Sequence, residues 1–385
     1  MRYARLLKCF IMMLGMALHS IAVLAQCHIV SHVVDIKTGE TLPFASVYVD
    51  SEKNTITNEE GDFSLDVDST DVIRFSYVGY QTLYVAADKV GETVQLARDG
   101  KVLDEVVVLG TELIIKKIRG EIKKTLREYD WKKTNFFYRQ LGRANSQATS
   151  FIEAFFTSHS AVQTKDFSLG AGRFVQVASS QTLTPQNFFT FMQVTLYNKY
   201  HTKERNVPLC PNYKDYYTTE CRRINDGEHP VYVVSFIPKD TTVWSVKAKV
   251  YADAETFKPL KYEGVGVNDW VENKIHDEKH VVPCDYKFVV HYQHDEDFIE
   301  VQSLHFDVRF SDNGKKYDVA GTMFNTGKRY IKGKGKLDFF DDLTMKIRDK
   351  GFDRKFWDDN EVVKRTPMEN EALELFEGDN NFGVF

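Results

Sequence analysis

The sequence predicts a mainly β protein, with a small N-terminal β-sandwich followed by a larger antiparallel α+β domain. Apolar and polar residues alternate in short runs over residues 33–80, turn residues recur there about every ten residues, and longer alternating runs return after residue 231. Alternation of this kind is typical of strands with one buried face, and closely spaced turns are typical of a sandwich. A first domain of about seventy residues is long enough for one modest core.

Residues 1–25 have the composition of a secretory signal peptide. Basic residues precede an apolar run from Cys9 to Leu24, and a small-residue cleavage site lies before Gln26. The run is short for a membrane span. Lipidation of Cys27 is the alternative, although Gln26 stands where a small residue is expected. We therefore expect an exported protein, periplasmic or associated with the outer membrane, with no membrane-spanning segment after signal cleavage.

The length of 385 residues indicates two or three domains. A net charge of −5, made more negative when the basic N-terminal segment is removed, argues against a nucleic-acid partner. Cys210 and Cys221 flank a tyrosine-rich loop and are the disulfide candidates for an oxidising compartment. Two separate buried thiols fit equally well, and a pair between Cys27 and Cys284 is less favoured.

The first domain is expected over residues 26–100. A strand from Val33 ends at the glycine turn of residues 37–40, residues 44–49 alternate, and residues 55–57 form a short β-branched strand. In the turn that follows, Gly61 supplies a positive φ angle without steric cost. A further strand runs over residues 72–80.

Three motifs in this domain carry a family resemblance: V-x-D-x-x-T-G-E-x-L-P-F-A-S-V-Y-V, T-x-T-N-x-E-G-x-F-x-L and I-x-F-S-Y-V-G-Y-Q. Together they resemble the carboxypeptidase-regulatory-like domain of Bacteroidota envelope proteins over about residues 29–97. The resemblance implies a transthyretin-like, seven-stranded sandwich and no peptidase activity. A similar domain precedes the plug of TonB-dependent receptors, with a segment like residues 103–108 after it. Here no plug follows, so we interpret that segment as an edge strand or linker.

Residues 101–130 form a linker that includes the clearest helix, residues 112–129. Ile114, Ile118, Ile122 and Leu126 fall on one stripe at helical spacing, and lysines lie off the stripe. A basic amphipathic helix can bind a membrane surface. We favour the interpretation that the apolar stripe covers a protein core.

The second domain is expected over residues 131–350, with a short helix at residues 184–199 and long strands beyond it. The alternating runs are residues 231–237, 243–253, 260–267, 286–294, 298–310 and 317–324. The hairpin around residues 254–259 is similar to a repeat of the periplasmic lipoprotein-carrier fold. That similarity implies an open barrel over a helix and, as an alternative function, a lipid or lipoprotein carrier.

Residues 351–385 are expected to form a helical tail. Thr366-Pro367-Met368-Glu369 is a capping box with proline at the first helical position, and the helix should run through Leu375 and stop at Gly378. The elements around Trp357 and Thr366 also occur in relatives of the first domain. So does the segment ending at Arg139, where Gln140 replaces the expected acid.

No catalytic, metal or cofactor motif is convincing. His201 and Glu204 match the H-x-x-E spacing of zinc carboxypeptidases but lack the α/β scaffold. The histidines at 276, 280, 291 and 294 lie in a loop or a strand. Asp66, Asp68 and Asp71 lack the glycine and the final glutamate of a calcium loop.

We therefore predict a non-catalytic envelope binding or accessory protein whose ligand is a protein or a glycan, with no cofactor. The alternatives are a periplasmic hydrolase with scattered site residues and the carrier named above. The oligomeric state and the identity of the ligand are left open.

Overall fold

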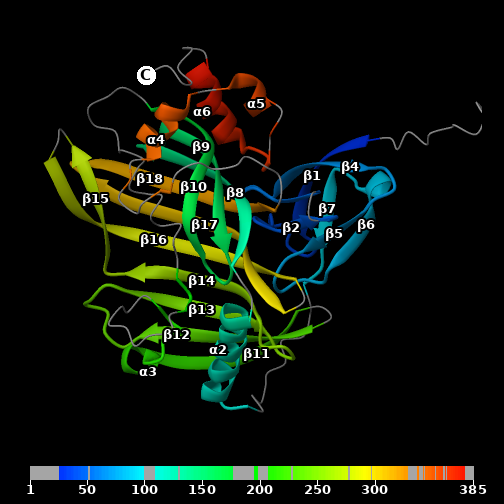
Figure 1. The fold of residues 1–385 in the computed structure, drawn as a ribbon, viewed down its shortest axis with the longest axis vertical. Coiled ribbons are helices and arrows are strands. Elements are labelled where there is room, and N and C mark those ends of the chain that lie inside the picture. The colour runs from blue at the N-terminus through cyan, green and yellow to red at the C-terminus, as the bar shows by residue number, and fades with distance from the viewer. Residues whose placement is uncertain are drawn as a thin grey trace, which may run out of the picture.

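The computed structural model consists of an N-terminal sandwich beside one long, curved sheet (Figure 1). The residues that the structure describes are 26–50, 53–98, 109–128, 131–176, 195–197, 207–226, 229–275, 278–295, 297–327, 336–337, 341, 343–351, 353–358, 360 and 362–377. The signal peptide, the segment 103–108 and almost all of the helix expected at 184–199 lie outside these residues.

The sandwich has seven strands in two sheets, with orders β4-β1-β7 and β3-β2-β5-β6. The strands are β1 (Gln26–Asp35), β2 (Ser46–Tyr48), β3 (Asn54–Ile56), β4 (Asp62–Asp68), β5 (Val72–Ser76), β6 (Leu83–Ala86) and β7 (Thr93–Leu96), with a 3-10 turn, η1 (Ala87–Lys89), before β7. Among the described strands, β1 and β7 alone pair in parallel. Side chains from both sheets, including Val33, Val47, Phe63 and Phe75, form a separate core. The expected transthyretin-like arrangement of seven strands is therefore present.

In the described part of the chain the large sheet has eleven strands, and every pairing among them is antiparallel. Its strands are β8 (Lys132–Ala144), β9 (Gln147–Ser160), β10 (Thr164–Gln176), β11 (Tyr217–Asp226), β12 (His229–Pro238), β13 (Ser245–Asp253), β14 (Pro259–Val267), β15 (Asp269–Ile275), β16 (Glu278–Asp295), β17 (Phe298–Asp312) and β18 (Lys315–Gly327). The order is β10-β9-β8-β18-β17-β16-β14-β13-β12-β11, and β15 pairs with β16. Among the described residues β10 and β11 do not pair with each other, so the sheet is open.

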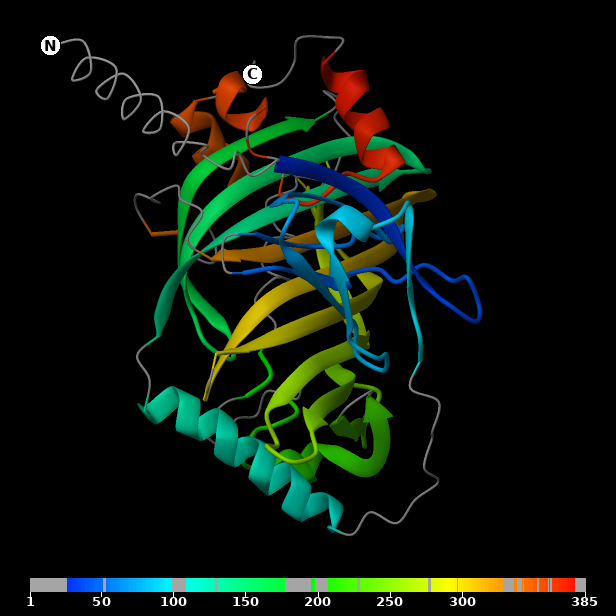
Figure 2. The same cartoon turned by 90° about the vertical axis from the view of Figure 1, so that its right-hand side faces the viewer.

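The inner face of the sheet carries the main core. On β17, Leu304, Phe306 and Val308 point inward, because alternate residues of a strand share a face. Helix α2 (Thr111–Glu128) lays its isoleucine stripe on this core, which confirms that the stripe covers a core. Figure 2 shows α2 at one end of the curved sheet. Helix α4 (Leu343–Lys350), which was not expected, packs Ile347 on the same core.

The outer face of the sheet is covered by the sandwich and by the C-terminal helices. Helix α5 (Arg354–Asp358) contributes Trp357 to an apolar cluster with Ile56 of β3 and with Phe137 of β8. Helix α6 (Pro367–Glu377) begins at the expected capping box, in which the Thr366 amide donates to Glu369 Oε2 at 2.8 Å and the Glu369 amide donates to Thr366 Oγ1 at 3.0 Å.

The predicted fold class, mainly β with a sandwich and an antiparallel sheet, is confirmed. A short helix, α3 (Tyr213–Tyr216), precedes β11, and Tyr213 and Tyr217 pack edge-on against Phe236 in the core. This tyrosine-rich stretch therefore contributes to the core. In the described part of the chain, no helix combines the length and the apolar character that a membrane crossing needs.

Candidate functional site

The contact between the sandwich and the outer face of the large sheet is the candidate functional site, and we call it the seam. Three contacts define the seam. Thr55 Oγ1 donates to the carbonyl of Val362 at 2.8 Å, and Gln302 Nε2 donates to Ser46 Oγ at 2.9 Å. The ring of Phe44 stacks on His305 with centroids 4.2 Å apart. The two domains are therefore joined by polar and aromatic contacts.

A cleft of about 650 Å3 opens along the seam. Strands β2, β3 and β5 form one wall, and strands β8, β16, β17 and β18 form the other. The lining residues are Ser46, Tyr48, Asn54, Arg74, Ser76, Lys132, Lys133, Thr134, Tyr292, Gln293, His294, Glu300, Gln302, Asn325 and Gly327. Most of these side chains are hydroxyls, amides or charged groups, so the cleft is polar.

Hydrogen bonds hold the sheet wall of the cleft in place. Glu300 accepts from Gln293 Nε2 at 2.8 Å and from Asn325 Nδ2 at 3.5 Å. Asn325 Oδ1 in turn accepts from Thr134 Oγ1 at 2.9 Å. Because each group fixes the next, the wall presents amides in set orientations, which favours recognition of a polar ligand.

The opposite wall offers a cation and an aromatic ring. The Arg74 guanidinium lies over the Tyr48 ring, 4.8 Å from its centroid. The Arg74 Nε atom is buried and has no hydrogen-bond partner within the described residues. A guanidinium is a charged group with several N–H donors, so this wall suits a ligand that brings an acceptor.

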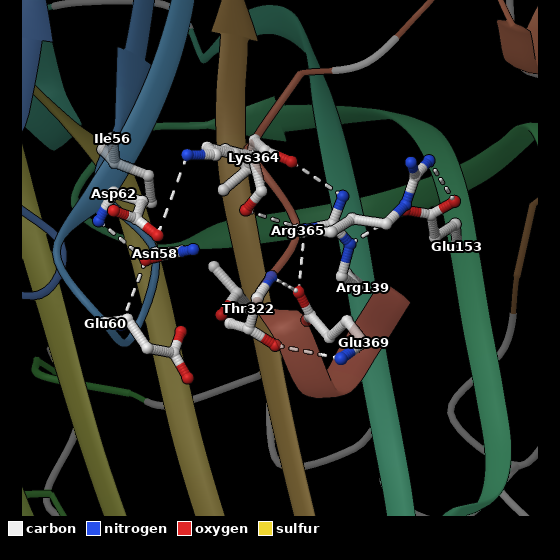
Figure 3. A network of polar contacts seen from close by, with 12 residues as sticks. Ile56, Asn58, Glu60, Asp62, Arg139, Glu153, Thr322, Lys364, Arg365 and Glu369 are labelled. Atoms are coloured by element: carbon white, nitrogen blue, oxygen red, sulfur yellow. Dashed lines mark hydrogen bonds and ion pairs between the residues drawn. The ribbon is translucent and has the colours of Figure 1, made fainter. Parts of the chain in front are cut away.

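A cluster of buried charges lies beside the seam and holds the C-terminal segment on the sheet. Figure 3 shows Arg139 between Glu153 and Glu369, with Asp62 of the sandwich directed toward Lys364. Arg139 Nε lies 2.8 Å from Glu153 Oε1, Arg139 Nη1 lies 3.3 Å from Glu369 Oε2, and Lys364 Nζ lies 3.8 Å from Asp62 Oδ2. Arg139 also donates to the carbonyl of Val363 at 2.8 Å.

Glu153 is the centre of this cluster. Burial by itself would raise the pKa of Glu153, but the charges of Arg139, Arg173 and Arg365 outweigh it and hold the pKa at about 2. The segment ending at Arg139 and the element around Thr366, both of which the sequence analysis singled out, therefore meet Glu153 of β9 in one ion cluster. Gln140, which replaces the expected acid, is not part of it, and Tyr138 donates a hydrogen bond to its side chain.

The cysteines named as disulfide candidates are free thiols in the structure. Cys210 is buried in the main core, and Cys221 lies on β11 with burial raising the pKa of its thiol to about 11. The structure forms no bond between them. Both the disulfide and the alternative of two separate thiols stay predictions.

The other polar candidates have structural partners or lie outside the described residues. His201, Glu204 and His276 lie outside the described residues. His294 pairs with the Pro259 carbonyl at 2.7 Å. Lys53 pairs with both Asp68 and Asp71, which explains that acidic cluster without calcium.

Sequence reasoning did not identify the residues of the seam, because they come from distant parts of the chain. Glu59, His305 and Asp307 meet there with their ligand atoms within 4.8 Å of one another. The turn around Glu59 was predicted only as a turn. The one local signal for the other two was their alternate spacing, which places them on the same face of a strand.

Comparison with known proteins identifies the first domain. Residues 31–108 match the family model of the CarboxypepD_reg-like domain. The N-terminal sandwich is a CarboxypepD_reg-like domain. The chain is also 37% identical over 120 residues to the TonB-dependent receptor SusC of Bacteroides thetaiotaomicron, a match that covers 30% of this chain and 11% of that protein. The chain thus spans about a tenth of the length of this relative.

Solved structures resemble the chain only distantly. A LolA superfamily protein from Nitrosomonas europaea has 9% identity and a TM-score of 0.22, covering 56% of this chain and 93% of that one. A putative outer membrane lipoprotein-sorting protein domain from Vibrio parahaemolyticus has 11% identity and a TM-score of 0.23, and the match covers 62% of this chain and 99% of that one.

Proposed function

We propose that the chain is a non-catalytic binding protein of the cell envelope that holds a glycan in the cleft along the seam. The observation that carries the proposal is the cleft lining: ordered amides on one wall, and the Arg74–Tyr48 pair on the other. Sugars present many hydroxyls and an apolar ring face, which amide groups and a tyrosine ring complement. A volume of about 650 Å3 also falls within the range of about 300–1,000 Å3 typical of ligand sites.

An envelope location is supported by two independent observations. The CarboxypepD_reg-like domain is shared with a protein named as a TonB-dependent receptor, and residues 1–25 have the composition of a signal peptide.

A binding role is favoured over hydrolysis because the carboxylate and the histidine that line the cleft are held by structural bonds. Glu300 accepts hydrogen bonds from two side chains, and His294 is bound to a backbone carbonyl. Burial lowers the pKa of His294. A general acid or base must instead reach the substrate and exchange its proton there.

A lipid carrier is less well supported. Such a protein needs an apolar cavity, and the inner face of the sheet is filled by its own side chains. Tyr262, Phe288 and Phe306 on that face are each at most 2% exposed.

A protein partner is the second candidate, favoured by a shallow groove of about 430 Å3 on the outer face of β12, β13, β14 and β16. Val265 and Val289 line this groove, and Lys247, Lys249 and Lys287 also line it. An exposed apolar strip of this kind is a common feature of protein contact sites.

Glycan binding can be tested on the full exported chain with an array of bacterial and plant oligosaccharides. We expect Tyr48→Ala and Arg74→Gln each to weaken binding of the selected sugar at least tenfold. The matched control is Tyr84→Ala, because Tyr84 is 62% exposed on the same sandwich but outside the cleft. Equal affinities for all three variants would refute the cleft as the site, and binding by none of the sugars would favour the protein partner.

A further inference from the structure

Three side chains of types that commonly serve as metal ligands meet within the seam. Glu59 lies in the turn between β3 and β4 of the sandwich, and His305 and Asp307 lie two residues apart on the outer face of β17. His305 Nε2 is 3.3 Å from Asp307 Oδ2 and 3.8 Å from Glu59 Oε1. The cluster therefore has one donor from the first domain and two from the second.

These separations suit a bound divalent cation. With metal–ligand bonds of about 2.0–2.1 Å, two ligands of a tetrahedral ion lie about 3.3 Å apart. On β17, His305 Nε2 and Asp307 Oδ2 already lie 3.3 Å apart. Glu59 comes from a turn and its side chain is 45% exposed, so a small shift of this carboxylate would complete the set.

The surroundings of His305 orient its Nε2 atom toward the carboxylates, and Nε2 lies within hydrogen-bonding distance of Asp307 Oδ2 at 3.3 Å. The other ring nitrogen, Nδ1, lies 3.0 Å from Thr322 Oγ1, the residue directly opposite on β18. When Nδ1 donates its proton to Thr322, Nε2 keeps a lone pair. A hydroxyl or carboxylate that orients a histidine in this way is typical of metal sites.

Phe44 fixes the plane of the imidazole at some backbone cost. Its ring stacks on His305, and its φ angle is +61°, a left-handed value that is unfavourable for a bulky residue. The stack holds the face of the imidazole and leaves the Nε2 edge directed at the two acids.

The charge balance of the cluster also favours a cation. Two carboxylates, Glu59 and Asp307, meet a single imidazole, and the ligand atoms of the three residues lie within 4.8 Å of one another. A cation between these groups would relieve the repulsion between the acids.

There is room for a further small ligand beside the cluster. A cavity of about 20 Å3, which is enough for one water molecule, is lined by Glu59, Asn58 and Thr322 among others. Asn58 is 4% exposed, and its Nδ2 has no hydrogen-bond partner within the described residues. Figure 3 shows its amide nitrogen turned toward Thr322. A water on the ion could accept from this amide.

We propose that Glu59, His305 and Asp307 bind a divalent transition-metal ion of the Zn²⁺ class that joins the sandwich to the large sheet. One nitrogen and two carboxylate oxygens are ligands that Zn²⁺ accepts, and a water would complete four-coordination. The site is separate from the glycan cleft, and its existence does not depend on the ligand bound there.

The test is calorimetric titration of the EDTA-treated full chain with ZnCl2. We expect one Zn²⁺ per chain, and at least tenfold weaker binding in His305→Ala and Glu59→Gln. Thr322→Val should weaken binding about 10–100-fold, because it removes only the group that orients the histidine. The matched control is His159→Ala, since His159 lies 3.9 Å from Asp166 with no third ligand in the described residues.

A second readout excludes binding by the cysteines. Co²⁺ at the proposed site should give a spectrum without thiolate charge-transfer bands, and Zn²⁺ should raise the Tm of the wild type but not of Glu59→Gln. Glu59 lies in a turn, so this variant should fold even if His305→Ala does not. The proposal would be overturned if His305→Ala and Glu59→Gln both kept the wild-type affinity for Zn²⁺. A Co²⁺ spectrum dominated by thiolate charge-transfer bands would overturn it as well.

Discussion

At the scale of single residues, ionisable side chains at and beside the seam lie where water is largely excluded. Glu153 is 1% exposed and is balanced by arginines that are themselves buried. His291 is 8% exposed, with Nδ1 lying 3.2 Å from Ser303 Oγ and Nε2 without a partner in the described residues. A buried ionisable group links stability to its protonation state, so both residues lead to predictions.

Glu153→Gln should destabilise the protein by about 3–5 kcal/mol, because it leaves buried guanidinium groups without their counter-charge. Urea unfolding followed by tryptophan fluorescence measures the loss. The control is Glu92→Gln at an exposed position, which should change the free energy of unfolding by less than about 0.5 kcal/mol. A similarly small effect at Glu153 would show that the arginines are stabilised in another way.

His291 should make the protein less stable in mild acid. Burial, followed by the charges of Lys261 and His305, lowers the pKa of His291 from 6.5 to about 3. Below pH 6.5 the imidazole of His291 therefore binds a proton in the unfolded chain but stays neutral in the folded chain. The stability that neutral His291 contributes is complete above pH 6.5 and is lost progressively as the pH falls toward 3.

His291→Gln should reduce this acid sensitivity. The fall in free energy of unfolding between pH 6.5 and pH 4.5 should be smaller in the variant than in the wild type by up to about 1.4 kcal/mol per pH unit. The matched control is His28→Gln, because His28 is exposed and paired with Asp66. An unchanged slope in His291→Gln would contradict the assignment.

At the scale of elements, α6 shows how a local signal can have a distant effect. Its capping box uses Glu369, whose other contact is Arg139 on β8. The start of the helix is therefore coupled to the buried charges of the sheet, and a defect in the cap should loosen both.

Thr366→Ala should cost about 0.5–2 kcal/mol, because the first turn of α6 loses its cap. Chemical denaturation measures this cost, and hydrogen exchange should show faster exchange at the Glu369 amide. Thr366→Ser keeps the hydroxyl and should retain most of the stability. If the serine and alanine variants behave alike, the hydroxyl is not responsible for the cap.

Elements with local signals could be predicted from the sequence, and their arrangement could not. The stripe on α2, the turn at Gly61 and the capping box each depend on residues within a few positions. Pairing of β8 with β18 joins segments far apart in the chain. The meeting of Glu59 with His305 needs both that strand order and the docking of the sandwich, so no local pattern could reveal it.

At the scale of the whole molecule, the outer face of the sheet serves as a docking surface within the chain. Ile56 of the sandwich is 1% exposed and packs with Phe137, Phe324 and Trp357. This apolar contact lies beside the polar cleft, so the same docking that buries Ile56 also forms the candidate site.

Ile56→Asp should separate the sandwich from the sheet, because it buries an unpaired charge at this contact. We expect increased hydrogen exchange on the outer face of β17, loss of glycan binding in the cleft and a lower Tm. Val72→Asp is the control, since Val72 is 53% exposed on the same sandwich. Retained protection of β17 in Ile56→Asp would show that other contacts suffice for docking.

The C-terminal segment has a consequence for the order of assembly. Val362 accepts a hydrogen bond from Thr55 of the sandwich, and Val363 accepts one from Arg139 of the sheet. A ribosome makes the sandwich well before this segment, because Thr55 and Val362 lie 307 residues apart in the chain. The first domain can therefore fold early, but it gains this partner only after the large sheet has been synthesised. A chain terminated before residue 362 would therefore carry both domains but would lack the backbone carbonyls that accept hydrogen bonds from both.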